Sequence, residues 1–417
     1  MCRPPVRSTP SSTRPSLLAW AVVVAVWLLV PRPALAQPLP TGPVSAFDGR
    51  LAVGAEVVAT IGERDDVAFF NYTDYEHNTL RMFRLAMSAS WRPVSRIAIV
   101  GEIRSEDLDW ARPYAAYIRV RPWINRAFDV QAGRIPPTFG AFGRRGYQGN
   151  DNPLIGYPLA YQYLTSLRPD AAPATVADLL VMRARGWRAS YPIGSQTPGP
   201  GVPLISAFRW DTGIQAHWEG QAIEVTGSVT SGTLADPRVS DNNGGKQVSS
   251  RLAYRPTAGL VFGASAARGE FFDREVTDAL PESGGSHAQT AFGADAEYSR
   301  GYWLVRSEVV WSRWNVPFAT PASNLTVGAL GAWVEGRYRV TPRIVVSGRA
   351  DRLAFSRLDV GPNLTPTWDA NVWRIEADAG YYIQRNLLAR VAVQHNDRDG
   401  GRVRKRTYYS GQVAYWF

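Results

Sequence analysis

The stretch VWRIEADAGYY, residues 372–382, alternates apolar side chains with charged or small ones, and it decides the fold. Its apolar face carries Trp373, Ile375, Ala377, Ala379 and Tyr381, and its charged face carries Arg374, Glu376 and Asp378. A period of two is that of a β-strand, because successive side chains of a strand point to opposite faces of the sheet. The stretch is therefore predicted to be a strand that separates an apolar environment from a polar one.

The same alternation recurs from Asp48 onward, in segments of roughly ten residues that end at turn residues. We expect about sixteen strands, at residues 51–60, 80–91, 96–104, 114–121, 128–134, 205–217, 222–230, 247–255, 260–268, 290–298, 303–314, 327–340, 343–355, 369–382, 387–395 and 406–417. An even number of antiparallel strands places the start of the first strand and the end of the last strand at the same end of the sheet. The sequence thus predicts an all-β, antiparallel fold.

Alternation alone fits both a soluble two-sheet sandwich and a closed barrel that meets lipid outside and water inside. Three features favour the barrel. The chain ends in an amphipathic strand, YYSGQVAYWF at 408–417, and short connections alternate with long polar ones at 232–245, 272–288 and 356–366. Aromatic residues also stand near predicted strand ends, where they suit the two interfaces of a membrane: Trp91, Trp123, Trp218, Tyr254, Tyr298, Trp303, Trp311, Tyr338 and Trp373.

An apolar run at the start of the chain, LLAWAVVVAVWLLV at 17–30, follows a basic stretch and precedes the pattern Ala34-x-Ala36. This layout is typical of a cleavable signal peptide. We expect residues 1–36 to be that signal peptide, 37–47 a short periplasmic segment and 48–417 the transmembrane barrel. A membrane anchor is the alternative, although the run is short for a bilayer. Cleavage would remove four arginines and no acidic residue, which lowers the formal net charge from +10 to +6.

The gap at residues 135–204 shows no clear alternation. One interpretation is a long loop that folds into the barrel and constricts it, starting with PPTFGAFGRRG at 136–146 and containing a short helix within 175–185. The other interpretation places two more strands near 178–184 and 187–193, for about eighteen in total. We favour the loop, because LLVM at 179–182 does not alternate.

These features together resemble the Gram-negative outer-membrane porins. The terminal Phe417 resembles their assembly signal, and FDVQAGRI at 128–135 looks like the porin strand that enters the constriction loop. The resemblance implies an outer-membrane location, contact with lipid, a water-filled channel for passive diffusion of small hydrophilic solutes or ions, and commonly a homotrimer. The chain departs from phosphate-selective relatives in having only two lysines, Lys246 and Lys405, so that arginines would have to replace a lysine ladder.

The inward face of the predicted strands is unusually charged, and such groups would cost about 2 to 4 kcal/mol each at the bilayer midplane, as measured for Arg and Lys. They must therefore line water or pair with one another. The predicted pore-lining residues are Arg84, Glu102, Arg104, Arg119, Arg121, Arg209, Asp211, Glu224, Arg251, Asp295, Glu297, Arg306, Glu308, Glu335, Arg337, Arg349, Asp351, Arg374, Glu376, Asp378 and Arg390. The predicted constriction residues are Arg144, Arg145, Arg183 and Arg185, which favour a modest anion preference.

Other functions fit the sequence less well. The four histidines are far apart in sequence, and the nucleophile and zinc motifs of common hydrolases are missing, so we expect no enzyme, no cofactor and no metal. The arginines are spread over strands, which disfavours a nucleic-acid partner. A structural or adhesive barrel with a closed lumen remains the main alternative to a porin. Whether residues 136–204 narrow the lumen or fill it separates the two.

Overall fold

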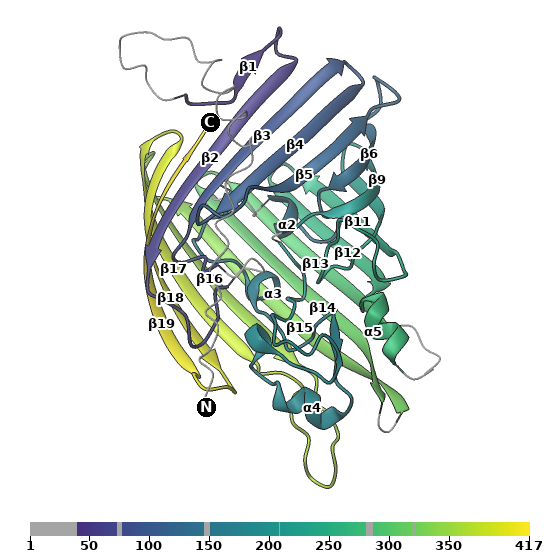
Figure 1. The fold of residues 1–417 in the computed structure, drawn as a ribbon. Coiled ribbons are helices and arrows are strands. Elements are labelled where there is room, and N and C mark those ends of the chain that lie inside the picture. The colour runs from purple at the N-terminus through teal and green to yellow at the C-terminus, as the bar shows by residue number, and fades with distance from the viewer. Residues whose placement is uncertain (1–39, 73–76, 146–150, 208, 281–286, 320–321) are drawn as a thin grey trace, which may run out of the picture. The chain divides into compact units, whose positions relative to one another are not determined.

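An antiparallel sheet of 17 strands dominates the computed structural model, which describes residues 40–72, 77–145, 151–207, 209–280, 287–319 and 322–417 (Figure 1). Residues Thr41–Phe417 belong to one compact unit. The predicted signal peptide, residues 1–36, lies outside the described residues.

The strands of this sheet are β1 (Val44–Ala46), β2 (Leu51–Gly62), β3 (Phe83–Val94), β4 (Ile97–Glu106), β5 (Arg112–Val120), β6 (Phe128–Ile135), β9 (Asp211–Glu219), β10 (Ile223–Thr230), β11 (Gln247–Thr257), β12 (Leu260–Glu270), β13 (Ala288–Arg300), β14 (Trp303–Ala319), β15 (Ala322–Arg339), β16 (Ile344–Phe355), β17 (Val372–Gln384), β18 (Leu387–Arg398) and β19 (Lys405–Trp416). A separate pair is formed by β7 (Ala171–Ala172) and β8 (Ile193–Gly194).

The sheet closes on itself. Each strand pairs with the next, β6 pairs with β9, and β19 returns to β2 with Ser410 opposite Gly62 and Trp416 opposite Glu56. The five strands β2–β6 and the eleven strands β9–β19 make a ring of sixteen within the described residues, and β1 is a short addition beside β2. The prediction of a sixteen-strand antiparallel barrel is confirmed. The eighteen-strand alternative is wrong, because residues 178–193 contribute no strand to the ring.

The two faces of the barrel wall differ as the alternation predicts. Along β17, buried and exposed residues alternate strictly from Val372 to Tyr381. Arg374 and Glu376 are almost fully buried on the inner face, whereas Trp373 and Ile375 are 38% and 53% exposed on the outer face. An outer surface rich in Ile, Val, Trp and Tyr suits lipid contact. None of the helices among the described residues is long and apolar enough to cross a membrane.

The connections at the two ends of the barrel differ in length. One end, which we call the turn end, carries both barrel termini and tight turns such as that between β17 and β18. The opposite end, the loop end, carries most of the long connections, among them residues 63–82, 136–210, 271–287 and 356–371. Short helices lie in these connections: α2 (Phe142–Arg145), α3 (Leu159–Gln162), α4 (Val176–Val181), a 3-10 turn at Gly186–Arg188, and α5 (Arg274–Ala279).

The helix expected within 175–185 forms as α4. Its start is fixed by a capping box, in which the Asp178 N–H donates to Thr175 Oγ1 and the Thr175 N–H donates to an Asp178 carboxylate oxygen. In contrast, β9 begins at Asp211 and not near residue 205 as the apolar pattern suggests. Ile205 is instead held away from the ladder, because its N–H donates to the Ala160 carbonyl and its side chain is buried.

The terminal Phe417 takes part in closing the ring, because its N–H donates to the Ala55 carbonyl at 3.0 Å and its carbonyl accepts from the Ala55 N–H at 3.1 Å. We expect Phe417→Asp to abolish most of the heat-modifiable folded form, since a carboxylate replaces an aromatic ring at the lipid boundary. Electrophoresis of the unheated and heated membrane fraction measures that form. The matched control is Leu364→Asp, which places the same charge at an exposed loop position. Equal folded yields of the two variants would contradict a role of Phe417 in assembly.

Candidate functional site

The connection between β6 and β9, residues 136–210, lies against the inner face of the barrel, and we call it the lumen segment. Every residue from 152 to 168 in this segment is buried. Ile155, Gly156 and Leu159 contact side chains of β16 and β17 that point inward. This part of the lumen segment is therefore packed against the inner wall and excludes water there.

Carboxylates of the barrel wall bind the backbone of the lumen segment. The N–H groups of Ile155 and Gly156 donate to Asp378 at 2.9 Å and to Glu376 at 2.7 Å. The Leu159 N–H donates to Asp351 at 3.3 Å, and the Ala141 N–H donates to Glu308 at 3.2 Å. Irregular backbone that leaves water needs a partner for each N–H. The wall carboxylates supply these partners.

Arginines of the wall bind the carbonyl groups of the same segment. Arg390 donates to the Asn152 carbonyl at 2.8 Å, and Arg374 donates to the Tyr157 carbonyl at 3.1 Å. Arg84 donates to the Tyr157 hydroxyl and to Glu56, both at 2.9 Å. Guanidinium groups suit this task because they carry five donors and stay charged. The wall therefore satisfies donors and acceptors of the segment alike.

The arginine at the centre of the wall is Arg349, whose side chain has no exposed surface. It pairs with Glu376 at 2.9 Å, with Asp351 at 3.0 Å and with Glu335 at 3.3 Å. Two of these carboxylates also accept backbone N–H groups of the lumen segment. Removing one partner of a buried ion pair leaves an uncompensated charge and is strongly destabilising. The wall network and the segment thus depend on each other.

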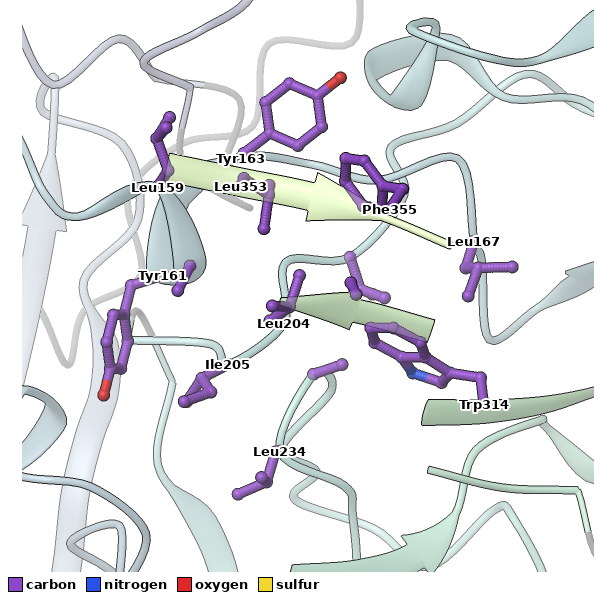
Figure 2. Packing of buried hydrophobic residues seen from close by; sticks show 14 of the residues in the cluster. Leu159, Tyr161, Tyr163, Leu167, Leu204, Ile205, Leu234, Trp314, Leu353 and Phe355 are labelled. Atoms are coloured by element: carbon purple, nitrogen blue, oxygen red, sulfur yellow. The ribbon is translucent and has the colours of Figure 1, made fainter. Parts of the chain in front are cut away.

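An apolar core lies between the lumen segment and the loop-end half of the wall. Figure 2 shows Leu159, Tyr163 and Leu167 of the segment gathered around Leu353 and Phe355 of β16. The core continues through side chains that are almost fully buried, including Leu204, Val310, Trp314, Val316, Phe318 and Trp368. The inner wall therefore changes from charged near the middle of the barrel to apolar near the loop end.

Asp369, just before β17, holds the lumen segment at two positions, Ser166 and Ala184. It accepts the Ser166 N–H at 2.7 Å and the Ala184 N–H at 2.9 Å. Burial raises the pKa of the Asp369 carboxyl, and these backbone hydrogen bonds lower it in part.

The predicted pore-lining residues mostly lie on the inner face. The buried ones are Arg84, Glu102, Arg104, Asp211, Glu224, Arg251, Asp295, Glu308, Glu335, Arg349, Asp351, Arg374, Glu376, Asp378 and Arg390. Arg119, Arg209, Glu297, Arg306 and Arg337 are partly exposed, and Arg121 is exposed in the turn after β5. Burial of the first group reflects contact with the lumen segment and with neighbouring charges. That they line a conduction path stays a prediction.

The four predicted constriction arginines are not brought together by the described contacts. The side chains of Arg144 and Arg145, at the end of α2, lie outside the described residues. Arg183 pairs with Asp399 at 2.7 Å. Arg185 is exposed at a cavity near the loop end. The role of these four residues as a constriction also stays a prediction.

The apolar core of the lumen was not expected from the sequence, yet β14 contains a signal for it. The stretch WSRWNVPF at 311–318 places Arg313 and Asn315 on the outer face and buries Trp314, Val316 and Phe318 inside. The polarity of the two faces is reversed relative to the membrane part of the strand. Such a reversal indicates that apolar material fills the lumen at that level.

Two cavities lie toward opposite ends of the barrel. One, of about 530 Å³, lies at the turn end and is lined by Glu56, Glu102 and Phe417 among others. The other, of about 610 Å³, is lined by Tyr163 and Leu164 of the segment and by loop residues. Tyr157 reaches Arg84, which pairs with Glu56 of the first cavity. The lumen segment is thus linked by hydrogen bonds to the lining of the turn-end cavity.

Docking of the lumen segment can be tested at Gly156, where a Cβ atom would meet Glu376 Oε2 at 2.6 Å and Gln394 Nε2 at 2.7 Å. We expect Gly156→Ala to lower the free energy of unfolding by about 1 to 3 kcal/mol, because the Gly156 hydrogen bond and the buried network are disturbed. Denaturant titration of the folded barrel in detergent measures this change. Gly336→Ala in β15 is the matched control, since its Cβ would meet nothing within 4 Å. A loss that is equal in both variants would argue against tight docking at Gly156.

Comparison with known proteins gives structural matches alone: no family model and no curated protein sequence matches the chain. The chain is similar to the anion-selective porin from Comamonas acidovorans, with a TM-score of 0.53 and 7% identity over 88% of this chain and 99% of that one. It is similar to Salmonella typhi OmpF in complex with daunomycin, with a TM-score of 0.53 and 12% identity over 90% and 100%. It is also similar to the trimer form of OmpT, an outer-membrane protein of Vibrio cholerae, with a TM-score of 0.50 and 11% identity over 88% and 99%.

At such low identities the likeness concerns the fold. It agrees with the closed antiparallel ring of sixteen strands. The chain therefore has the fold of the porin-like outer-membrane β-barrels.

Proposed function

We propose that the protein forms a narrow water-filled channel for passive diffusion of small hydrophilic solutes or ions across the outer membrane of a Gram-negative bacterium. The observation that carries this proposal is the closed sixteen-strand ring with a charged inner face, on which Arg119, Arg306 and Arg337 are partly exposed. A ring of this width has room for an aqueous lumen as well as a segment folded against its wall. Apolar side chains on the outer face and charged ones inside are what lipid outside and water inside require.

The path that we propose leads from the turn-end cavity past the lumen segment toward the loop end. Because residues 152–168 are buried against the wall, the remaining width beside them sets the size limit for a solute. A small conductance is the physical consequence.

A modest anion preference is part of the proposal. The inner wall pairs most of its charges, as Arg349 and Arg251 illustrate, so its net field is small. The selective charges would be arginines of the lumen segment, namely Arg144 and Arg145 at its start and Arg185 near the loop end. A guanidinium stays charged at any working pH, and low-dielectric walls focus its field.

A closed structural or adhesive barrel is the second candidate function. Burial of the whole run 152–168 favours it, because a fully packed lumen conducts nothing. Enzymatic activity is a weaker candidate, because three of the histidines lie on separate elements with separate partners. His77 contacts Asp107 and Asp109, His217 bonds to Thr226, and His395 bonds to Thr407.

We further propose that the apolar outer face contacts lipid and that the protein assembles as a homotrimer.

Conduction separates the first two candidates. We expect the wild-type protein to give small stepwise currents in planar bilayers. Tyr157→Ala should give steps about twofold larger, because it removes a buried side chain of the lumen segment that packs between Arg84 and Phe142. Tyr302→Ala, which changes an exposed turn residue, should leave the steps as in wild type. Absence of steps from wild type and from Tyr157→Ala alike would favour the closed barrel.

Ion preference tests the selectivity part of the proposal. The double variant Arg144→Ala with Arg145→Ala should lower the anion-to-cation permeability ratio about twofold, since two fixed positive charges leave the segment that we propose as the constriction. The reversal potential in a salt gradient measures this ratio. Arg300→Ala, which changes an exposed arginine at the end of β13, should leave the potential unchanged. An unmoved potential in the double variant, with conduction intact, places the selective charges elsewhere.

A further inference from the structure

The cavity of about 610 Å³ near the loop end has a composition that the wall network does not explain, and we call it the loop-end basin. Three connections line it: residues 67–69 from the β2–β3 loop, residues 163–164, 181 and 183–188 of the lumen segment, and Arg398, Gly401 and Arg402 from the β18–β19 hairpin. Its volume falls in the range of small-molecule sites, which run from about 300 to 1,000 Å³.

The charge of the basin is one-sided. Five arginines line it, at positions 183, 185, 188, 398 and 402, and its lining contains no carboxylate. Arg183 is compensated by Asp399 at 2.7 Å. Arg398 is 5% exposed and donates to the carbonyls of Gly400 and Val403 at 3.0 and 3.1 Å, which satisfies its donors without neutralising its charge.

The other three arginines of the basin are exposed: Arg185, Arg188 and Arg402. Within the part of the chain that the structure describes, none of the three forms an ion pair with a carboxylate. Among the described acids of these connections, Asp66 pairs with Arg64 at 3.4 Å, and Asp369 accepts backbone N–H groups. Uncompensated positive charge over a concave surface attracts anions.

The basin also contains an aromatic cluster. Phe69 and Trp187 stack with ring centroids 5.2 Å apart and an interplanar angle of 15°, and Tyr72 lies 4.5 Å from Trp187. Phe69 and Trp187 both line the cavity. A flat ring of a ligand can pack against this cluster by stacking or edge-to-face contact.

The backbone that presents these groups is strained and held in place. Phe69 and Ala184 both have positive φ, at 54° and 62°, which residues with a Cβ rarely adopt. The Phe69 N–H donates to Asp65 at 2.9 Å, and the Ala184 N–H donates to Asp369 at 2.9 Å. Strain that the surrounding structure maintains is found at ligand sites, where it preorganises the lining.

We propose that the loop-end basin binds small organic anions that carry a flat ring, with aromatic carboxylates as the chemical class. The carboxylate would pair with Arg188 and Arg402, and the ring would pack against Phe69 and Trp187. As the entry site of a channel this basin would select solutes, and in that respect the inference rests on the proposed function. Binding itself can be measured without conduction.

The experiment is calorimetric titration of the refolded full chain in detergent at low salt, with benzoate as the probe. Three further probes separate the contribution of the negative charge from that of the ring. Acetate and inorganic phosphate carry a charge without a ring, and benzyl alcohol carries a ring without a charge. We expect benzoate to bind at least about tenfold more tightly than the other three, since it alone uses both features. The double variant Arg188→Gln with Arg402→Gln should weaken benzoate about fivefold, because each exposed ion pair contributes little by itself. The matched control is Arg92→Gln with Arg300→Gln, two exposed arginines at the turn end.

A third variant tests the aromatic cluster: Trp187→Leu should reduce benzoate binding to the level of acetate while the heat-modifiable folded form persists. The inference is overturned if acetate or phosphate binds as tightly as benzoate, or if the Arg188 and Arg402 variant binds benzoate like wild type. Single-channel currents of the same preparations keep the two proposals apart. Conduction without benzoate binding would refute the basin alone, and benzoate binding without conduction would refute the channel alone.

Discussion

The hydrogen bonds between the wall carboxylates and the backbone of the lumen segment are the interaction on which the rest of the structure depends. Irregular backbone cannot leave water unless its N–H and carbonyl groups find partners. Buried carboxylates and guanidinium groups, in turn, cannot remain charged inside a protein without several good contacts. Glu376 shows both needs met at once, since it accepts the Gly156 N–H and pairs with Arg349.

Much of the barrel could be predicted from the sequence because its constraint is local. Lipid outside and polar material inside force a period of two on each strand, and β17 follows that period from Val372 to Tyr381. The start of β9 could not be predicted in this way. Ile205 has the side chain of a strand residue, but its position is set by a bond to Ala160, forty-five positions earlier in the chain.

The alternation of apolar and polar residues does not reveal what fills the lumen, and the reason is physical. A charged inward residue looks identical in the sequence whether it meets water, another charge or a backbone amide. Arg374 and Arg390 were predicted to line a pore, and each donates to a carbonyl of the lumen segment. The number of charges on the wall therefore says little about the field that a solute meets. That field comes from charges without an ion-pair partner, and near the loop end the described residues of this kind include Arg185, Arg188 and Arg402.

The strength of the docking contacts decides whether the lumen segment can act as a moving gate. Six backbone N–H groups of the segment donate to five wall or loop carboxylates, from Ala141 at one end to Ala184 at the other. At about 1 kcal/mol each, these hydrogen bonds contribute about 6 kcal/mol, which by itself corresponds to a displaced fraction of roughly one in twenty thousand. The apolar core around Leu353 and Phe355 lowers this fraction further. The segment is therefore a fixed part of the wall, and a solute that crosses the barrel passes beside it.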